Sequence, residues 1–209
     1  MNQRIRTAGG VSLLITALAA FPALAACPST PEDAKKGIQF KFDDGSSSEV
    51  FLRDGGLIEE WSMSAEADEY GLNDSVTVSQ HGVWLTEIAD VVDGKIQEET
   101  RSVMTYTEGG AEIGPFGPGR EWRGAGIWDE GTELEAHETH LITSGQETTL
   151  PIGPCSYTIY PIRIEYNANG ERFTDFLFAF PELGITAFVG SQSGYEFWNP
   201  KILSIETLG

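Results

Sequence analysis

Short runs in which apolar and polar residues alternate, separated by glycine-containing turns, fill most of this chain from residue 38 onward. The first run places apolar side chains at every second position, namely Ile38, Phe40 and Phe42, and Asp44-Gly45 follows it as a turn signal. Alternation with a period of two is typical of a β-strand that buries one face. The pattern therefore predicts a chain built mainly from strands.

The remaining strands follow from the same alternation and from the turn residues between them. They are expected near residues 50–52, 61–63, 76–79, 83–92, 96–106, 121–128, 132–142, 157–166, 172–180, 185–189 and 202–207. Asp93-Gly94 and Asn167-Ala168-Asn169-Gly170 are hairpin signals, and the chain holds 24 glycines in 209 residues, which favours many turns. Ten to twelve strands with short turns predict a mainly β protein, with one antiparallel sheet curved into a barrel or half-barrel. A β-sandwich is the alternative.

The first 25 residues have the composition of a signal peptide. Arg4 and Arg6 precede an apolar run over 11–21 that is too short to span a bilayer, and Ala23-Leu24-Ala25 is a small-x-small cleavage pattern. Export to the periplasm of a Gram-negative bacterium is expected. Residues 26–209 then form a single β domain, in which 26–36 is a short N-terminal segment with helix-start chemistry at Thr30-Pro31.

Two cysteines leave two alternatives for Cys27. Leu24-Ala25-Ala26-Cys27 fits the bacterial lipobox, so Cys27 would become a lipid-modified first residue and the protein an outer-membrane lipoprotein. Alternatively Cys27 forms a disulfide with Cys155, which uses both cysteines in an oxidising compartment. The disulfide is the preferred prediction because patterned sequence begins soon after Cys27, without a long spacer.

The charge balance restricts the partners. With 32 acidic against 13 basic residues, the formal net charge is −19, which argues against nucleic acid and against direct binding to an anionic membrane except through an N-terminal lipid anchor. The hydrophobic fraction of 40% is too high for a disordered acidic tail, so a core is expected.

No established catalytic pattern occurs in the sequence. Gly190-Ser191-Gln192-Ser193-Gly194 resembles a nucleophile elbow but places Gln at the nucleophile position, and no glycine-rich phosphate loop leads into a helix. The glycine- and proline-rich residues 108–120 are expected to be a loop. We therefore expect a protein that is not an enzyme and that has no cofactor.

His137 and His140 are weak candidates for a metal site. They would share one face of a helix, but the surrounding segment is expected to be a strand, in which they point to opposite sides. Glu138 with His140 then forms a same-face pair, which is half a site. An ordinary acidic strand is the preferred interpretation, and no metal is expected.

The segment from Trp122 to Trp128 suggests a ligand slot. On a strand, Trp122, Gly124, Gly126 and Trp128 share one face, so two indoles about 20 Å apart would flank a floor without side chains. Such a slot would suit an acyl chain or another flat apolar ligand. The alternative is that both indoles are core residues and the glycines allow another chain segment to approach.

Two segments of the C-terminal third resemble segments of known proteins. Leu150-Pro151-Ile152-Gly153-Pro154-Cys155-Ser156-Tyr157 and Phe180-Pro181-Glu182-Leu183-Gly184-Ile185 are similar to segments of uncharacterised exported β-rich proteins of alphaproteobacteria. More remotely, they resemble lipoprotein-carrier (Lol-type) envelope proteins. That resemblance implies an incomplete antiparallel barrel around an apolar cavity, but this sequence lacks the helices that plug such a barrel.

Three functional hypotheses follow. The preferred one is a non-catalytic envelope protein that binds an apolar or acyl ligand in a barrel cavity. A structural or partner-binding periplasmic module that contacts another envelope protein is the second. The third is a metal-binding or hydrolytic protein that uses His137 and His140.

Overall fold

The computed structural model describes residues 27–65, 74–108, 114–129, 136–168 and 170–209. Its elements are α1 (Pro31–Lys36), β1 (Ile38–Phe42), β2 (Ser47–Leu52), η1 (Asp54–Gly56), β3 (Leu57–Met63), β4 (Asp74–Gln80), β5 (Trp84–Val92), β6 (Lys95–Ile96), η2 (Glu98–Thr100), β7 (Ser102–Glu108), β8 (Glu121–Asp129), β9 (Ala136–Ser144), β10 (Thr148–Ile152), β11 (Cys155–Ala168), β12 (Glu171–Phe180), β13 (Ile185–Ser193), β14 (Glu196–Trp198) and β15 (Ile202–Thr207). The expected signal peptide lies outside the described residues.

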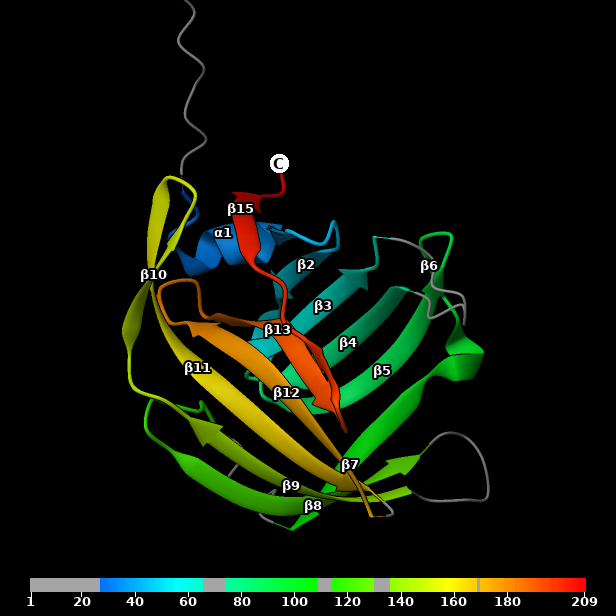
Figure 1. Ribbon diagram of the computed structural model, residues 1–209. Helices are drawn as coiled ribbons and strands as arrows, with labels where there is room; N and C mark the ends of the chain where they lie inside the picture. The colour runs from blue at the N-terminus through cyan, green and yellow to red at the C-terminus, as the bar shows by residue number, and fades with distance from the viewer. Residues whose placement is uncertain (1–26, 66–73, 109–113, 130–135, 169) are drawn as a thin grey trace, which may run out of the picture.

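One antiparallel sheet contains all the described strands. Its order is β14-β13-β12-β11-β9-β8-β7-β5-β4-β3-β2-β1-β15, with β10 paired to β11 and β6 paired to β5. The sheet curves so that β2 to β5 lie across from β11 to β13, with β7, β8 and β9 joining the two sides (Figure 1). Because β14 and β15 do not pair, the barrel stays open. The predicted mainly β fold, with one antiparallel sheet curved into a barrel or half-barrel, is confirmed, and the structure shows that the sheet does not close.

Some strand boundaries differ from the prediction. The strand expected at 96–106 is divided into β6 and β7 by the short helix η2, in which Thr100 N–H donates to the Gln97 carbonyl at 3.0 Å. The short strands β10 and β14 raise the number above the ten to twelve expected, to 15 in the described part of the chain. Of the expected loop 108–120, Glu108 ends β7 and residues 114–120 form no strand.

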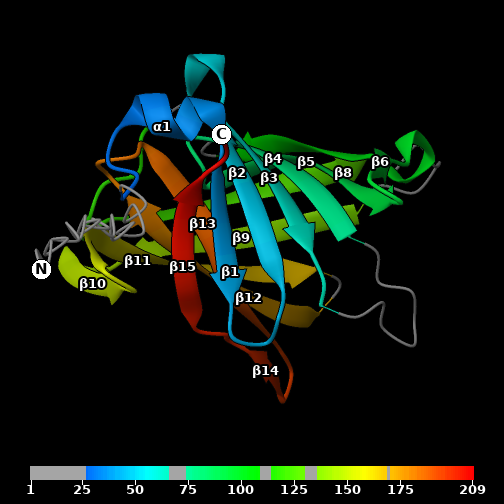
Figure 2. The ribbon, with the colours of Figure 1, turned by 90° about the horizontal axis from the view of Figure 1, so that it is seen from above.

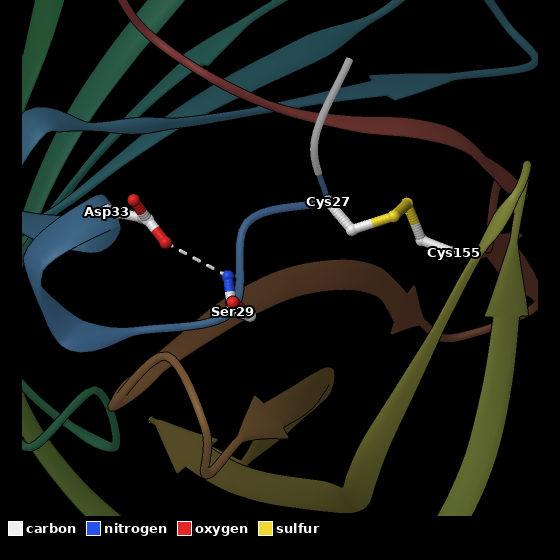
Figure 3. The surroundings of a disulfide bond; sticks show 4 residues. All are labelled: Cys27, Ser29, Asp33 and Cys155. Carbon is white, nitrogen blue, oxygen red and sulfur yellow. Dashed lines mark hydrogen bonds between the residues drawn. A yellow bond between two sulfur atoms is a disulfide. The ribbon is translucent and has the colours of Figure 1, made fainter. Parts of the chain in front are cut away.

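The N-terminal segment is held in two ways. Thr30 caps α1, since Asp33 N–H donates to Thr30 Oγ1 at 3.3 Å while the Asp33 carboxylate accepts from Ser29 N–H at 3.1 Å (Figure 3). Cys27 forms a disulfide with Cys155 at the start of β11, with the two Cα atoms 5.8 Å apart. This bond confirms the preferred prediction. A thioether-linked lipid at Cys27 would need the same sulfur, so the bond and the anchor exclude each other.

The strand β13 divides the interior of the barrel. Its residues 185–187, 189 and 190 are buried, so both of its faces are covered. Ile185, Ala187 and Val189 belong to the main core cluster, which also contains Phe40 and Phe180. A second cluster around Trp84 includes Phe116, Ile142, Ile162 and Ala179.

Two side chains seat β13 against the opposite wall of the barrel. Glu60 from β3 accepts a hydrogen bond from the Phe188 N–H, with both carboxylate oxygens at 3.3 Å from the nitrogen. Thr186 donates its hydroxyl to the Gly82 carbonyl at 2.5 Å. Gly82 has φ +70°, and a Cβ there would collide with Thr186, so the turn before β5 requires glycine. The first part of β13, before its pairing with β14, thus docks against the opposite wall through side chains instead of a backbone ladder.

Candidate functional site

A cavity lies between β13 and the opposite wall because the inward positions of β3 and β4 carry small polar residues. These positions are Ser62, Ser75, Thr77 and Ser79, and register pairs Ser62 with Ser75. Small side chains leave space where leucines or phenylalanines would fill it. The space has a volume of about 250 Å³, and we call it the central cavity.

The other wall of the central cavity is apolar. Ile164 from β11, Leu177 from β12 and Phe188 from β13 line it, and register places Leu177 beside Phe188. The cavity therefore has a hydroxyl-rich wall facing an aliphatic and aromatic wall. Such a cross-section fits a ligand with an apolar body that also carries a polar group.

Two further hollows share lining residues with the central cavity. One, of about 320 Å³, is bounded by Glu60, Ser48, Phe188 and Trp198, and we call it the Glu60 hollow. The other, of about 360 Å³, is bounded by Trp128, Asp175 and Ser191 among others, and also by Phe188. Phe188 borders all three spaces, and we refer to them together as the inner groove.

Glu60 is the buried carboxyl between the central cavity and the Glu60 hollow. Its residue is 7% exposed, and no basic residue pairs with it in the described part of the chain. Burial raises the pKa of Glu60 to about 7, although the Phe188 N–H and the neighbouring Ser48 hydroxyl both act to lower it. The group therefore titrates near neutral pH.

Asp175 is the carboxyl at the other end of the central cavity. Burial raises its pKa to about 6, while hydrogen bonding by the Tyr166 hydroxyl opposes the rise. The pKa of Tyr166 is also raised, mainly by burial and next by the negative charge of Asp175. The tyrosine therefore stays protonated at ordinary pH. Asp175 borders both the central cavity and the hollow at Trp128.

His140 lies on the inner face of β9 beside these groups. Its Nε2 is 3.1 Å from Glu138 Oε2, and its ring packs edge-on against Tyr106 and Tyr166, at centroid distances of 5.5 and 4.9 Å. His137 lies on the exposed face of the same strand, where register pairs it with Ile127. Among the described residues there is no group of three His, Cys, Asp or Glu side chains that could hold a metal ion.

At Gly126 a protein side chain occupies the slot expected at Trp122, Gly124, Gly126 and Trp128. Met104 from β7 occupies the space above Gly126, where a Cβ would collide with its sulfur. The Trp122 ring packs edge-on against Trp84 and Tyr106, at 6.3 and 5.8 Å. Gly124 borders a hollow lined by Arg123 and Arg163, and Trp128 is the member of the stripe that lines the inner groove.

Sequence reasoning missed Glu60 and Asp175. For Asp175 a signal exists, because Phe173, Leu177 and Ala179 share its strand face and make it a lone acid among apolar residues. For Glu60 the local pattern predicts the wrong strand face. Trp61 is apolar and would be assigned to the inner face, which would place the neighbouring Glu60 on the outer face. The structure instead points Trp61 to the outside, against Val76.

No family model matches the chain, and no curated protein matches it. Among solved structures, the fold is similar to that of the hypothetical lipoprotein YmcC from Escherichia coli. The sequence identity is 11% and the TM-score is 0.42, with 82% of this chain and 86% of that chain covered. The resemblance to alphaproteobacterial exported proteins and to lipoprotein carriers stays a prediction. None of the described helices is long and apolar enough to cross a membrane.

Proposed function

We propose that this protein is a non-catalytic protein of the bacterial envelope that binds a small, mainly apolar ligand in the inner groove. The observation that carries the proposal is the central cavity of about 250 Å³, walled by Ile164, Leu177 and Phe188 on one side and by small hydroxyl residues on the other. A folded interior is normally close-packed, so a row of small residues at inward positions indicates a space kept for a ligand.

The location in the envelope rests on two further features. The Cys27–Cys155 disulfide is of the kind that persists in oxidising compartments such as the periplasm. The first 25 residues have signal-peptide composition. Since Cys27 is used in the disulfide, we propose a periplasmic protein without a lipid anchor at that residue.

The test is titration with 1-N-phenylnaphthylamine, a neutral apolar probe whose fluorescence rises in apolar surroundings. We expect one probe per protein. Thr77→Leu places a larger side chain in the central cavity and should weaken binding at least tenfold. Thr105→Leu makes the same change on the exposed side of β7 and should leave binding unchanged.

Two results would contradict the proposal: no saturable binding by the natural protein, or equal binding by both variants. In either case a structural or partner-binding module would be the better interpretation, and other envelope proteins should then be tested as partners.

A further inference from the structure

The inner groove has a one-sided charge. Glu60, Glu138 and Asp175 line it, whereas none of the described residues lining the central cavity or its two adjoining hollows is Lys, Arg or His. A carboxylate in such a poorly hydrated space is destabilised unless a proton or a cation accompanies it. A bound cation would therefore be favoured in the groove and a bound anion disfavoured.

The Glu60 hollow contains a second buried polar group. Ser48 is 2% exposed and lines this hollow. Its hydroxyl acts on the Glu60 carboxyl and helps to lower the pKa of that group. The Ser48 oxygen can still accept a hydrogen bond from a donor placed in the hollow.

Aromatic rings border the same hollow. Phe188 and Trp198 stack with centroids 5.5 Å apart and an interplanar angle of 22°, and both line the space that Glu60 and Ser48 face. The Trp198 indole is held by a 2.8 Å hydrogen bond from its Nε1 to Asp44 Oδ2. Aromatic faces attract cations through the ring quadrupole. A carboxylate, a buried hydroxyl and aromatic rings thus meet in one hollow.

Resting on the proposed function, we infer that the ligand is an aliphatic amine. Its ammonium group lies in the Glu60 hollow, where it donates to the Glu60 carboxylate and to Ser48 Oγ beside the rings of Phe188 and Trp198. Its apolar chain runs past Phe188 into the central cavity, against Ile164 and Leu177. An ammonium group has three N–H donors, so it can satisfy both oxygens at once.

Three eight-carbon probes that differ in the head group test this inference: n-octylamine, 1-octanol and octanoate. Their affinities are measured by isothermal titration calorimetry at pH 8, where Glu60 is ionised and the amine is protonated. We expect octylamine to bind at least tenfold more tightly than octanol, and octanoate to bind more weakly than both.

Two variants and a control locate the head group. Glu60→Gln should remove the preference for octylamine over octanol while octanol binding persists, and Ser48→Ala should weaken octylamine several-fold without affecting octanol. As a control, Glu49→Gln removes one negative charge from the outward-facing position of β2 that follows Ser48. It should change neither the octylamine nor the octanol affinity.

The outcomes separate the two proposals. If octanol and octylamine bind equally, or if Glu60→Gln keeps the amine preference, the amine inference is wrong and the apolar-ligand function stands. If none of the three probes and no phenylnaphthylamine binds, the proposed function fails as well. If Glu60→Gln does not fold, the affinities of octylamine, octanol and octanoate for the natural protein still test the amine inference.

Discussion

At the residue scale, Glu60 has a structural role and is the group to which we assign ligand binding in our proposal. Its carboxyl lies on the inner face of β3, accepts the Phe188 N–H that the edge of β13 presents, and borders the central cavity. A hydrophobic residue at this position would fill part of the groove and leave that N–H without an acceptor, which costs about 1–3 kcal/mol. The acid therefore both seats β13 and keeps a polar group at the ligand space.

The raised pKa of Glu60 predicts a pH-dependent stability. The folded protein binds the Glu60 proton more tightly than the unfolded chain, whose carboxyl has a pKa of 4.5 against about 7 when folded. The free energy of unfolding therefore falls as pH rises through this window, and the loss is complete above pH 7. Between pH 5 and pH 8 the loss due to Glu60 should be about 2–3 kcal/mol.

The measurement is urea unfolding at pH 5 and pH 8. Glu60→Gln keeps a carbonyl acceptor for Phe188 N–H but cannot ionise, so its stability should fall less over this range than that of the natural protein. Asp175 acts with the same sign, since its pKa is raised to about 6, and Asp175→Asn separates its share. Equal pH dependence in the natural protein and Glu60→Gln would contradict the prediction.

At the scale of elements, β13 is the strand that makes the groove. It follows β12 through a tight turn at 181–184, and before it pairs with β14 at residues 191–193 it turns the edge away from β12 toward β3. One face joins the core cluster of Phe40 and Phe180, and the other borders the central cavity. An exposed strand edge invites pairing with other chains, and docking it inside the barrel removes most of that hazard.

The contact of Gly82 with Thr186 should be sensitive to one methyl group. Gly82→Ala introduces a Cβ at φ +70° and directly against the Thr186 side chain, so both backbone strain and a clash oppose folding. Gly94→Ala has the same strain at φ +71° but open space around the new Cβ. We expect a loss of about 1 kcal/mol for Gly94→Ala and at least 1–2 kcal/mol more for Gly82→Ala.

Thermal and urea unfolding of the two variants checks this expectation. Similar losses in both would mean that β13 shifts easily and is not held by the Gly82 turn. Weakened phenylnaphthylamine binding in Gly82→Ala alone would further link the position of β13 to the central cavity.

At the scale of the whole molecule, the disulfide connects the chain's two halves. Cys27 and Cys155 are 128 residues apart in sequence, and the bond drawn in Figure 3 fixes the segment before α1 to the start of β11. Figure 2 shows α1, β10 and β11 on the same side of the molecule. The segment before α1 is short and pairs with no strand in the described residues, so the disulfide, the buried Pro28 side chain and the helix cap attach it to the fold.

Removal of this bond should destabilise the fold strongly. In the chain-entropy account, closing so long a loop contributes about 4–5 kcal/mol to the free energy of unfolding. We expect Cys155→Ser, paired with Cys27→Ser to avoid a free thiol, to unfold at markedly lower urea concentration. Reductant should shift the natural protein in the same direction and leave the double variant unchanged. A double variant as stable as the oxidised protein would contradict the prediction.

Much of the architecture was accessible from sequence because its signals are local. Alternation and turn residues predicted most of the strands, including the hairpin of β11 and β12, and two cysteines in a chain expected to be exported predicted the disulfide. The candidate site was less accessible. The expected Trp122–Trp128 slot contains Met104, whose approach from β7 depends on strand pairing across the sheet.

What the sequence by itself determined is which residues share a strand face; what only the tertiary structure decided is which face looks inward. In β4 the apolar Val76 points outward, where Trp61 and Ile96 cover it, whereas Thr77 and Ser79 point into the barrel. Alternation is symmetric between the two faces of a strand, so it carries no information on orientation. Only the curvature of the sheet and the inward docking of β13 turned a row of small hydroxyl residues into the wall of a cavity.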